Sequence, residues 1–178
     1  MPEVNMRWVI MRDSCMAIFA SSVLLISCGP VSDENTSTGT SVEIAAGLTF
    51  RDDGHLTISR DGDIYAELAI EIADDDSTRA RGMMQRTSMP DNTGMIFLFD
   101  QEVDRTFWMA NTPLSLDLIF INADSTITMI KKYMQPLSAR NVASEGPSQF
   151  VLEVIAGYSD TMGLIEGDRL SWYRHDKD

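Results

Sequence analysis

The most constraining feature of the sequence is a pair of apolar runs at residues 95–99 and 114–121. Both runs are apolar at most successive positions, which indicates strands buried on both faces rather than strands at a sheet edge. The junction between them combines aromatic and polar residues, and Pro113 favours an extended conformation at Thr112. We therefore expect a hairpin-like pair of buried strands at the centre of the fold.

A third segment, residues 64–73, has the period of two that is typical of a strand with one face in water. Ile64 and Ile72 fall on its inner face, whereas Glu67 and Glu71 fall on its outer face. About seven short strands separated by turns indicate a mainly β fold, a β-sandwich or barrel-like single domain. The other short strands are expected at 55–59, 126–134, 149–155 and 169–173, with a long loop at 135–148.

One or two short helices complete the expected domain, at residues 78–86 and 158–162. Three aspartates and Ser77 precede the first, and they suit a helix N-terminus better than a calcium loop, which needs spaced acids and a distal glutamate. Apolar side chains such as Met83 recur at helical spacing, so one face can pack on the sheet. Gly82 indicates either close packing or the end of this helix.

The N-terminal residues have the pattern of a bacterial lipoprotein signal peptide. Arg7 and Arg12 precede an uncharged run of 12 residues at positions 16–27, which is shorter than the ~20 residues that span a bilayer. The run ends in Leu-Ile-Ser-Cys, which resembles a lipobox and predicts lipidation of Cys28. The alternative is an ordinary signal peptide with a chance cysteine.

The sequence therefore divides into a signal peptide at 1–27, a flexible polar tether at 28–47 and a β domain at 48–178. Two or three acyl chains would provide a lasting membrane anchor. We expect a protein of the cell envelope, on the periplasmic face. The outer membrane is favoured because Gly29, not an aspartate, follows the cysteine.

Charge and cysteine placement exclude several function classes. The net charge of −13 argues against nucleic acid as a partner, because phosphate binding requires a basic surface. Cleavage before Cys28 would remove Cys15 and leave no thiol for a disulfide, a zinc site or a nucleophile. His55 and His175 have no neighbours that suggest a catalytic triad or a metal pair. We predict no cofactor and no metal, and the oligomeric state stays open.

Two carboxylates occupy apolar strand positions. Asp117 shares a face with Ile119 and Ile121, and Glu153 shares a face with Val151 and Ile155. A buried carboxylate must be paired, hydrogen-bonded or protonated. Each could be held at a strand end by an arginine or by backbone N–H groups. Alternatively, they line a polar site.

The aromatic junction offers further candidates for such a site. Adjacent strand residues point to opposite faces, so of Phe107 and Trp108 one can be core while the other faces outward. An outward Trp108 beside Asn111 would suit a sugar or another flat ligand, whereas core packing is the alternative. The candidate ligand-binding set is Arg86, Trp108, Asn111, Thr112, Asp117 and Glu153.

The chain resembles the DUF192 family over about residues 55–175. The resemblance implies a mostly β, sandwich-like domain, often exported, without an established biochemical role. The family's usual lysine before Asn111 is Ala110 here, so any part of a site formed by that lysine is absent. The resemblance rests on the segments 79–86, 89–90, 94–99 and 107–112, on Leu116-Asp117, Pro136 and Leu152-Glu153, and on Gly167-Asp168.

We therefore expect a lipid-anchored envelope protein that binds a small molecule or a cell-wall ligand as an accessory module. One alternative is a hydrolase or transferase that uses Asp117 and Glu153 as an acid/base pair. Another is an envelope module that binds a protein partner through its edge strands.

Overall fold

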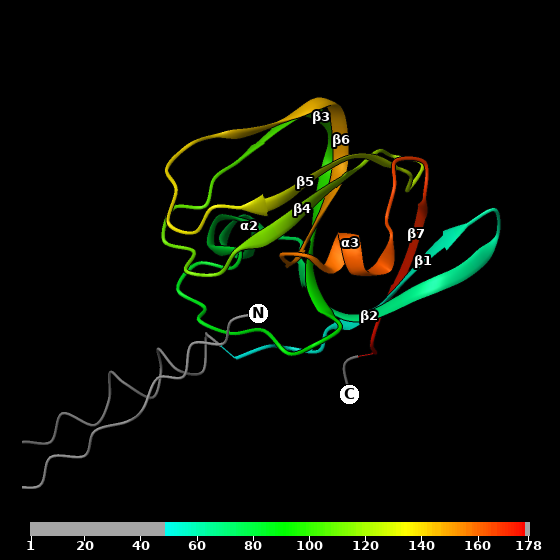
Figure 1. Ribbon diagram of the computed structural model, residues 1–178, viewed down its shortest axis with the longest axis horizontal. Coiled ribbons are helices and arrows are strands. Elements are labelled where there is room, and N and C mark those ends of the chain that lie inside the picture. The colour runs from blue at the N-terminus through cyan, green and yellow to red at the C-terminus, as the bar shows by residue number, and fades with distance from the viewer. Residues whose placement is uncertain (1–48, 177–178) are drawn as a thin grey trace, which may run out of the picture. The chain divides into compact units, whose positions relative to one another are not determined.

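The computed structural model describes residues 49–176, which form one curled sheet and two short helices (Figure 1). The predicted signal peptide, Cys28 and the tether lie outside the described residues. Within residues 49–176, no helix is long and apolar enough to cross a membrane. The strands are β1 (Gly54–Arg60), β2 (Asp63–Ala73), β3 (Thr93–Phe107), β4 (Leu116–Ile121), β5 (Ile127–Met134), β6 (Val142–Ile155) and β7 (Arg169–Arg174), and the helices are α2 (Asp76–Arg81) and α3 (Tyr158–Met162).

The sheet has the strand order β5-β4-β6-β3-β2-β1-β7. All neighbouring strands are antiparallel except β2 and β3, which are parallel. An isolated bridge between Thr126 and Arg169 connects the starts of the two edge strands, and the Ile127 amide donates to the Asp168 carbonyl at 2.8 Å. The sheet thus curls into a half-barrel, which confirms the predicted mainly β, barrel-like fold.

Both faces of the central strands are buried, each in its own apolar cluster. We call them the α3 face, which includes Ile119, Leu152 and Val154, and the α2 face, which includes Phe120 and Val151. Figure 1 shows the two helices on either side of β4 and β5. Burial on both faces explains why the apolar runs of β4 and β6 lack a period of two.

The predicted hairpin of buried strands is wrong, because β6 lies between β3 and β4 in the sheet. The predicted loop at 135–148 is also too long. β3 continues to Phe107, and β6 begins at Val142 and pairs with it. Most side chains of this outer arm are exposed or half-buried on both faces, so the arm carries no hydrophobic period.

The burial of two β2 side chains and the extent of the first helix also differ from the prediction. Ile64 is 57% exposed because it lies at the outer end of β2, whereas Glu71, expected in water, is fully buried on the α2 face. Helix α2 ends at Arg81 and not at residue 86, which confirms the interpretation of Gly82 as the helix end. Gly82 has a φ of 48°, and its N–H closes the last turn on the Thr78 carbonyl. The acidic cap is confirmed, because the Asp75 side chain accepts bonds from the Ser77 and Thr78 amides.

Candidate functional site

Asp117 is a fully buried carboxylate whose acceptors are satisfied by the backbone. One oxygen accepts from the Tyr133 amide at 2.9 Å, and the other accepts from the Gly157 and Ser159 amides, each at 3.1 Å. Gly157 is the N-cap of α3 and has no side chain with which to cap it. Asp117 therefore supplies that cap from a neighbouring strand and fixes α3 to the sheet.

Glu153 lies on the adjacent strand but points to the opposite face of the sheet. In the β4–β6 register Asp117 faces Val154 and Glu153 faces Leu118, and Val154 and Leu118 belong to different faces. The two carboxylates therefore do not converge on one space, as an acid/base pair would require.

The Glu153 carboxyl is buried without a complete set of partners. Only 5% of the residue is exposed, and its Oε2 has no hydrogen-bond partner among the described residues. Burial raises the pKa of this carboxyl to about 8, against an opposing effect of the Arg86 guanidinium. Glu153 is thus mostly a neutral acid at pH 7, able to donate one hydrogen bond and to accept others.

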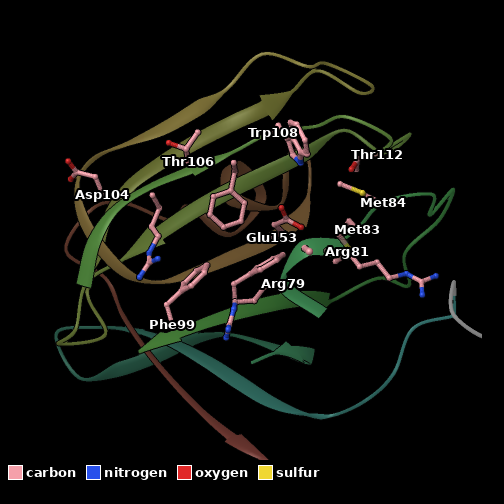
Figure 2. A pocket seen from close by; sticks show the side chains of 15 residues that line it. Arg79, Arg81, Met83, Met84, Phe99, Asp104, Thr106, Trp108, Thr112 and Glu153 are labelled. Atoms are coloured by element: carbon pink, nitrogen blue, oxygen red, sulfur yellow. The ribbon is translucent and has the colours of Figure 1, made fainter. Parts of the chain in front are cut away.

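A cavity of about 410 Å³ lies in front of Glu153 (Figure 2). Its walls come from α2 and the turn after it, from β3 between Phe97 and Phe107, from the β3–β4 junction and from Glu153 on β6. Gly82 belongs to the wall, and a Cβ there would lie 3.1 Å from the Phe97 ring. The lining residues are Arg79, Ala80, Arg81, Gly82, Met83, Met84, Phe97, Phe99, Asp104, Arg105, Thr106, Phe107, Trp108, Thr112 and Glu153.

Aromatic rings form the apolar part of the cavity wall. Phe107 packs edge-to-face against Phe97, Phe99 and Phe120, with ring centroids 5.2, 6.4 and 5.9 Å away. Trp108, the first residue after β3, is 55% exposed. Phe107 therefore anchors the wall in the core, while Trp108 offers its surface at the rim.

Two guanidinium groups lie against another wall ring, Phe99. The Arg105 guanidinium is 3.8 Å from the ring centroid and that of Arg79 is 5.5 Å away. Arg105 donates to the backbone carbonyls of Gln101 and Ser148. Burial, and then the neighbouring Arg79, lower the pKa of Arg105, so the two cations interact unfavourably.

Three of the predicted ligand-binding residues, Trp108, Thr112 and Glu153, line this cavity, whereas Asp117, Asn111 and Arg86 do not. Thr112 is buried and bonded through its backbone to Met109 and Leu137.

The remaining predicted residues are placed elsewhere. Asn111 has a φ of 60° and is exposed, and its carbonyl accepts from the Gln85 amide. Arg86 forms a buried bidentate pair with Glu71, beside a second hollow of about 240 Å³.

The sequence did not single out Phe99 or Arg79 and Arg105 as site residues. Phe99 was part of an apolar run. Arg79 and Arg105 are 26 positions apart in the sequence, and the β2–β3 crossover is what brings them close together in the fold. In the part of the chain that the structure describes, no group of three or more acidic, His or Cys side chains could hold a metal ion.

The chain belongs to the DUF192 family ("Uncharacterized ACR"), whose model matches residues 56–172. A Sinorhizobium meliloti 1021 protein described as a candidate transcription regulator is similar in structure, with 33% identity and a TM-score of 0.65. That match covers 70% of this chain and 98% of the other. A protein of unknown function from Novosphingobium aromaticivorans DSM 12444 has 31% identity and a TM-score of 0.63, covering 66% and 84%. No curated protein matches the chain.

Proposed function

We propose that this DUF192 protein is a lipid-anchored binding module of the cell envelope that holds a small ligand in the cavity in front of Glu153. The observation that carries the proposal is the orphaned, buried Glu153 Oε2 at the wall of an accessible space of about 410 Å³. Buried polar atoms without partners are rare in folded proteins, and a ligand would supply the missing bond.

The composition of the cavity supports the same proposal. Ligand sites are typically concave, about 300–1,000 Å³ in volume, and lined by apolar and aromatic side chains with a few placed polar groups. This cavity combines Phe97, Phe107 and Trp108 with one buried carboxyl and three arginines. Because Trp108 is more than half exposed, its ring is accessible to a ligand without any rearrangement.

The envelope part of the proposal rests on the lipobox-like residues that end at Cys28. Replacement of that cysteine, Cys28→Ser, should move the protein from the membrane fraction to the soluble fraction of cells. Retention in the membrane fraction would contradict the lipid anchor and leave the cavity unaffected.

One structural relative is described as a candidate transcription regulator, but the charge of this chain argues against DNA as its ligand. DNA binding requires many phosphate contacts from lysine and arginine. This chain has 14 such residues against 27 acidic ones, and a net charge of −13 would repel DNA.

Thermal unfolding of the protein against a library of cell-wall fragments, sugars, peptides and divalent ions tests the proposal. A ligand at about 100 times its dissociation constant adds about 2.7 kcal/mol, which raises the midpoint by several degrees. Trp108→Ala should abolish the shift, whereas Tyr173→Ala, at an equally exposed aromatic on β7, should preserve it. A shift that survives Trp108→Ala, or none across the library, would overturn the proposed site.

A further inference from the structure

We infer that the cavity binds an organic anion with a flat apolar body, its anionic group on Arg105 and Arg79 and its body against Phe99, Phe107 and Trp108. The inference rests on the proposed function and specifies the chemical class of the ligand. Three independent features of the cavity support it.

The first feature is an unfavourable pair of cations. Arg79 and Arg105 both stack on Phe99, and each raises the electrostatic cost of the other. Within residues 49–176, no ion pair joins Arg105 to a carboxylate, and Arg79 pairs only with Asp76, whose side chain is fully exposed. An anion placed between two guanidiniums would relieve this repulsion through charge-assisted hydrogen bonds.

The carboxylate that lines the cavity near this pair does not serve as the counter-ion. Asp104 is exposed, and in Figure 2 its carboxylate points away from Phe99 and Glu153. The anionic position is therefore left to a molecule from outside.

The second feature is the arrangement of the aromatic rings. Figure 2 shows Phe99 and Trp108 on opposite sides of the cavity, with the Glu153 carboxyl between them in this view. Phe107 lies in the wall and is fixed by its edge-to-face contacts. A flat ring system can contact such surfaces face to face or edge to face, as aromatic pairs prefer.

The third feature is the neutral state of the buried acid. An ionised carboxylate on the cavity wall would repel an anionic ligand, but a protonated Glu153 does not. It can instead donate to a polar atom on the ligand body. One wall thus supplies positive charge and another supplies a neutral donor, which suits an anion rather than a cation.

The test uses 2-naphthoate and 2-naphthamide, which share one flat ring system and differ in charge. Calorimetric titration of the full chain at pH 7 and low salt should give roughly tenfold tighter binding of the carboxylate, as one charge-assisted contact implies. Arg105→Gln should remove this preference and keep amide binding. Arg105→Lys should keep part of the preference for the carboxylate. Arg140→Gln removes the same charge at an exposed position outside the cavity lining, and it should leave the preference unchanged.

The outcomes separate this inference from the proposed function. Equal affinities for the two compounds, both abolished by Trp108→Ala, would overturn the anion preference and retain a small-ligand site. Binding of neither compound would overturn the aromatic anion class, while a hit of another class in the library would still support a binding module. A preference that persists in a folded Arg105→Gln variant would overturn the assignment of the anionic position.

Discussion

Asp117 and Glu153 are buried carboxylates on adjacent strands, and their surroundings differ completely. Asp117, on the α3 face, accepts three backbone hydrogen bonds and fixes a helix. Glu153, on the α2 face, has an orphaned oxygen beside a cavity. A carboxylate completed by the protein stabilises the scaffold, whereas one left incomplete costs stability and is available to a ligand.

The charged side chains near Glu153 fall into two groups. Near Glu153, Glu71 and Arg86 neutralise each other in a buried bidentate pair, so neither is available to complete the acid. The positive groups that remain, Arg79, Arg81 and Arg105, line the cavity. The α2 face therefore keeps the orphaned Glu153 oxygen and the cavity arginines on one side and a matched buried pair on the other.

The largest effect on stability is expected for Asp117→Ala. The change removes the acceptor of three N–H donors, one in a buried and two in partly buried hydrogen bonds, and each orphaned donor costs about 1–3 kcal/mol where water cannot reach it. We expect a loss of roughly 3 kcal/mol or more in the free energy of unfolding, measured by urea denaturation. A loss below about 1 kcal/mol would show that water replaces the carboxylate and that Asp117 does not hold α3.

Glu153→Gln should raise the free energy of unfolding, whereas Asp117→Ala lowers it. A folded-state pKa of about 8 against an ordinary value of 4.5 means that the folded protein binds the extra proton between these pH values. Wild-type stability is therefore full below pH 4.5 and falls as pH rises toward about 8. The amide cannot ionise, so the variant should be more stable at pH 8 by roughly 1–3 kcal/mol.

Denaturant unfolding at several pH values checks this prediction. The stability difference between wild type and Glu153→Gln should grow from pH 5 to pH 8 and then level off. A difference independent of pH would mean that Glu153 has an ordinary pKa in the folded protein. In that case its contrast with Asp117 would be one of hydrogen bonding alone.

A smaller effect is expected on the pH dependence of binding. As pH rises through about 8, ionised Glu153 would add a negative charge beside an anionic ligand, so 2-naphthoate should bind several-fold more weakly at pH 9 than at pH 6.5. The other charged groups that face the acid or line the cavity are Arg79 and Arg81 from α2, Asp104 and Arg105 from β3, and Arg86 from the segment after α2.

Calorimetric titration of wild type and Glu153→Gln separates these contributions. The variant should bind 2-naphthoate with little change between the two pH values, because it lacks the titrating carboxyl. An equal loss of affinity in both proteins would assign the pH dependence to another group.

The sequence predicted part of this arrangement correctly. Alternation placed Asp117 with Ile119 and Glu153 with Val151, and both carboxylates are buried as expected. The sequence could not show that these two rows point to opposite faces of one sheet, because that depends on the pairing of β4 with β6. Local periodicity contains no information on such long-range pairing.

The same limit explains the missed part of the cavity. Residues 100–107 are largely polar, so nothing marked them as a continuation of β3. The position of Arg105 over Phe99 follows only from the arm that β3 forms with β6.

The parallel pairing of β2 and β3 separates the part of the chain that shapes the cavity from the part that maintains the sheet. Residues 74–92 form the crossover between these strands, and they contribute Arg79, Gly82 and Met83 to the wall. Every other neighbouring strand pair is antiparallel and does not use this crossover. Insertions or substitutions in this segment would therefore change the cavity wall and leave the half-barrel unchanged. Relatives could diverge in function by this route without diverging in fold.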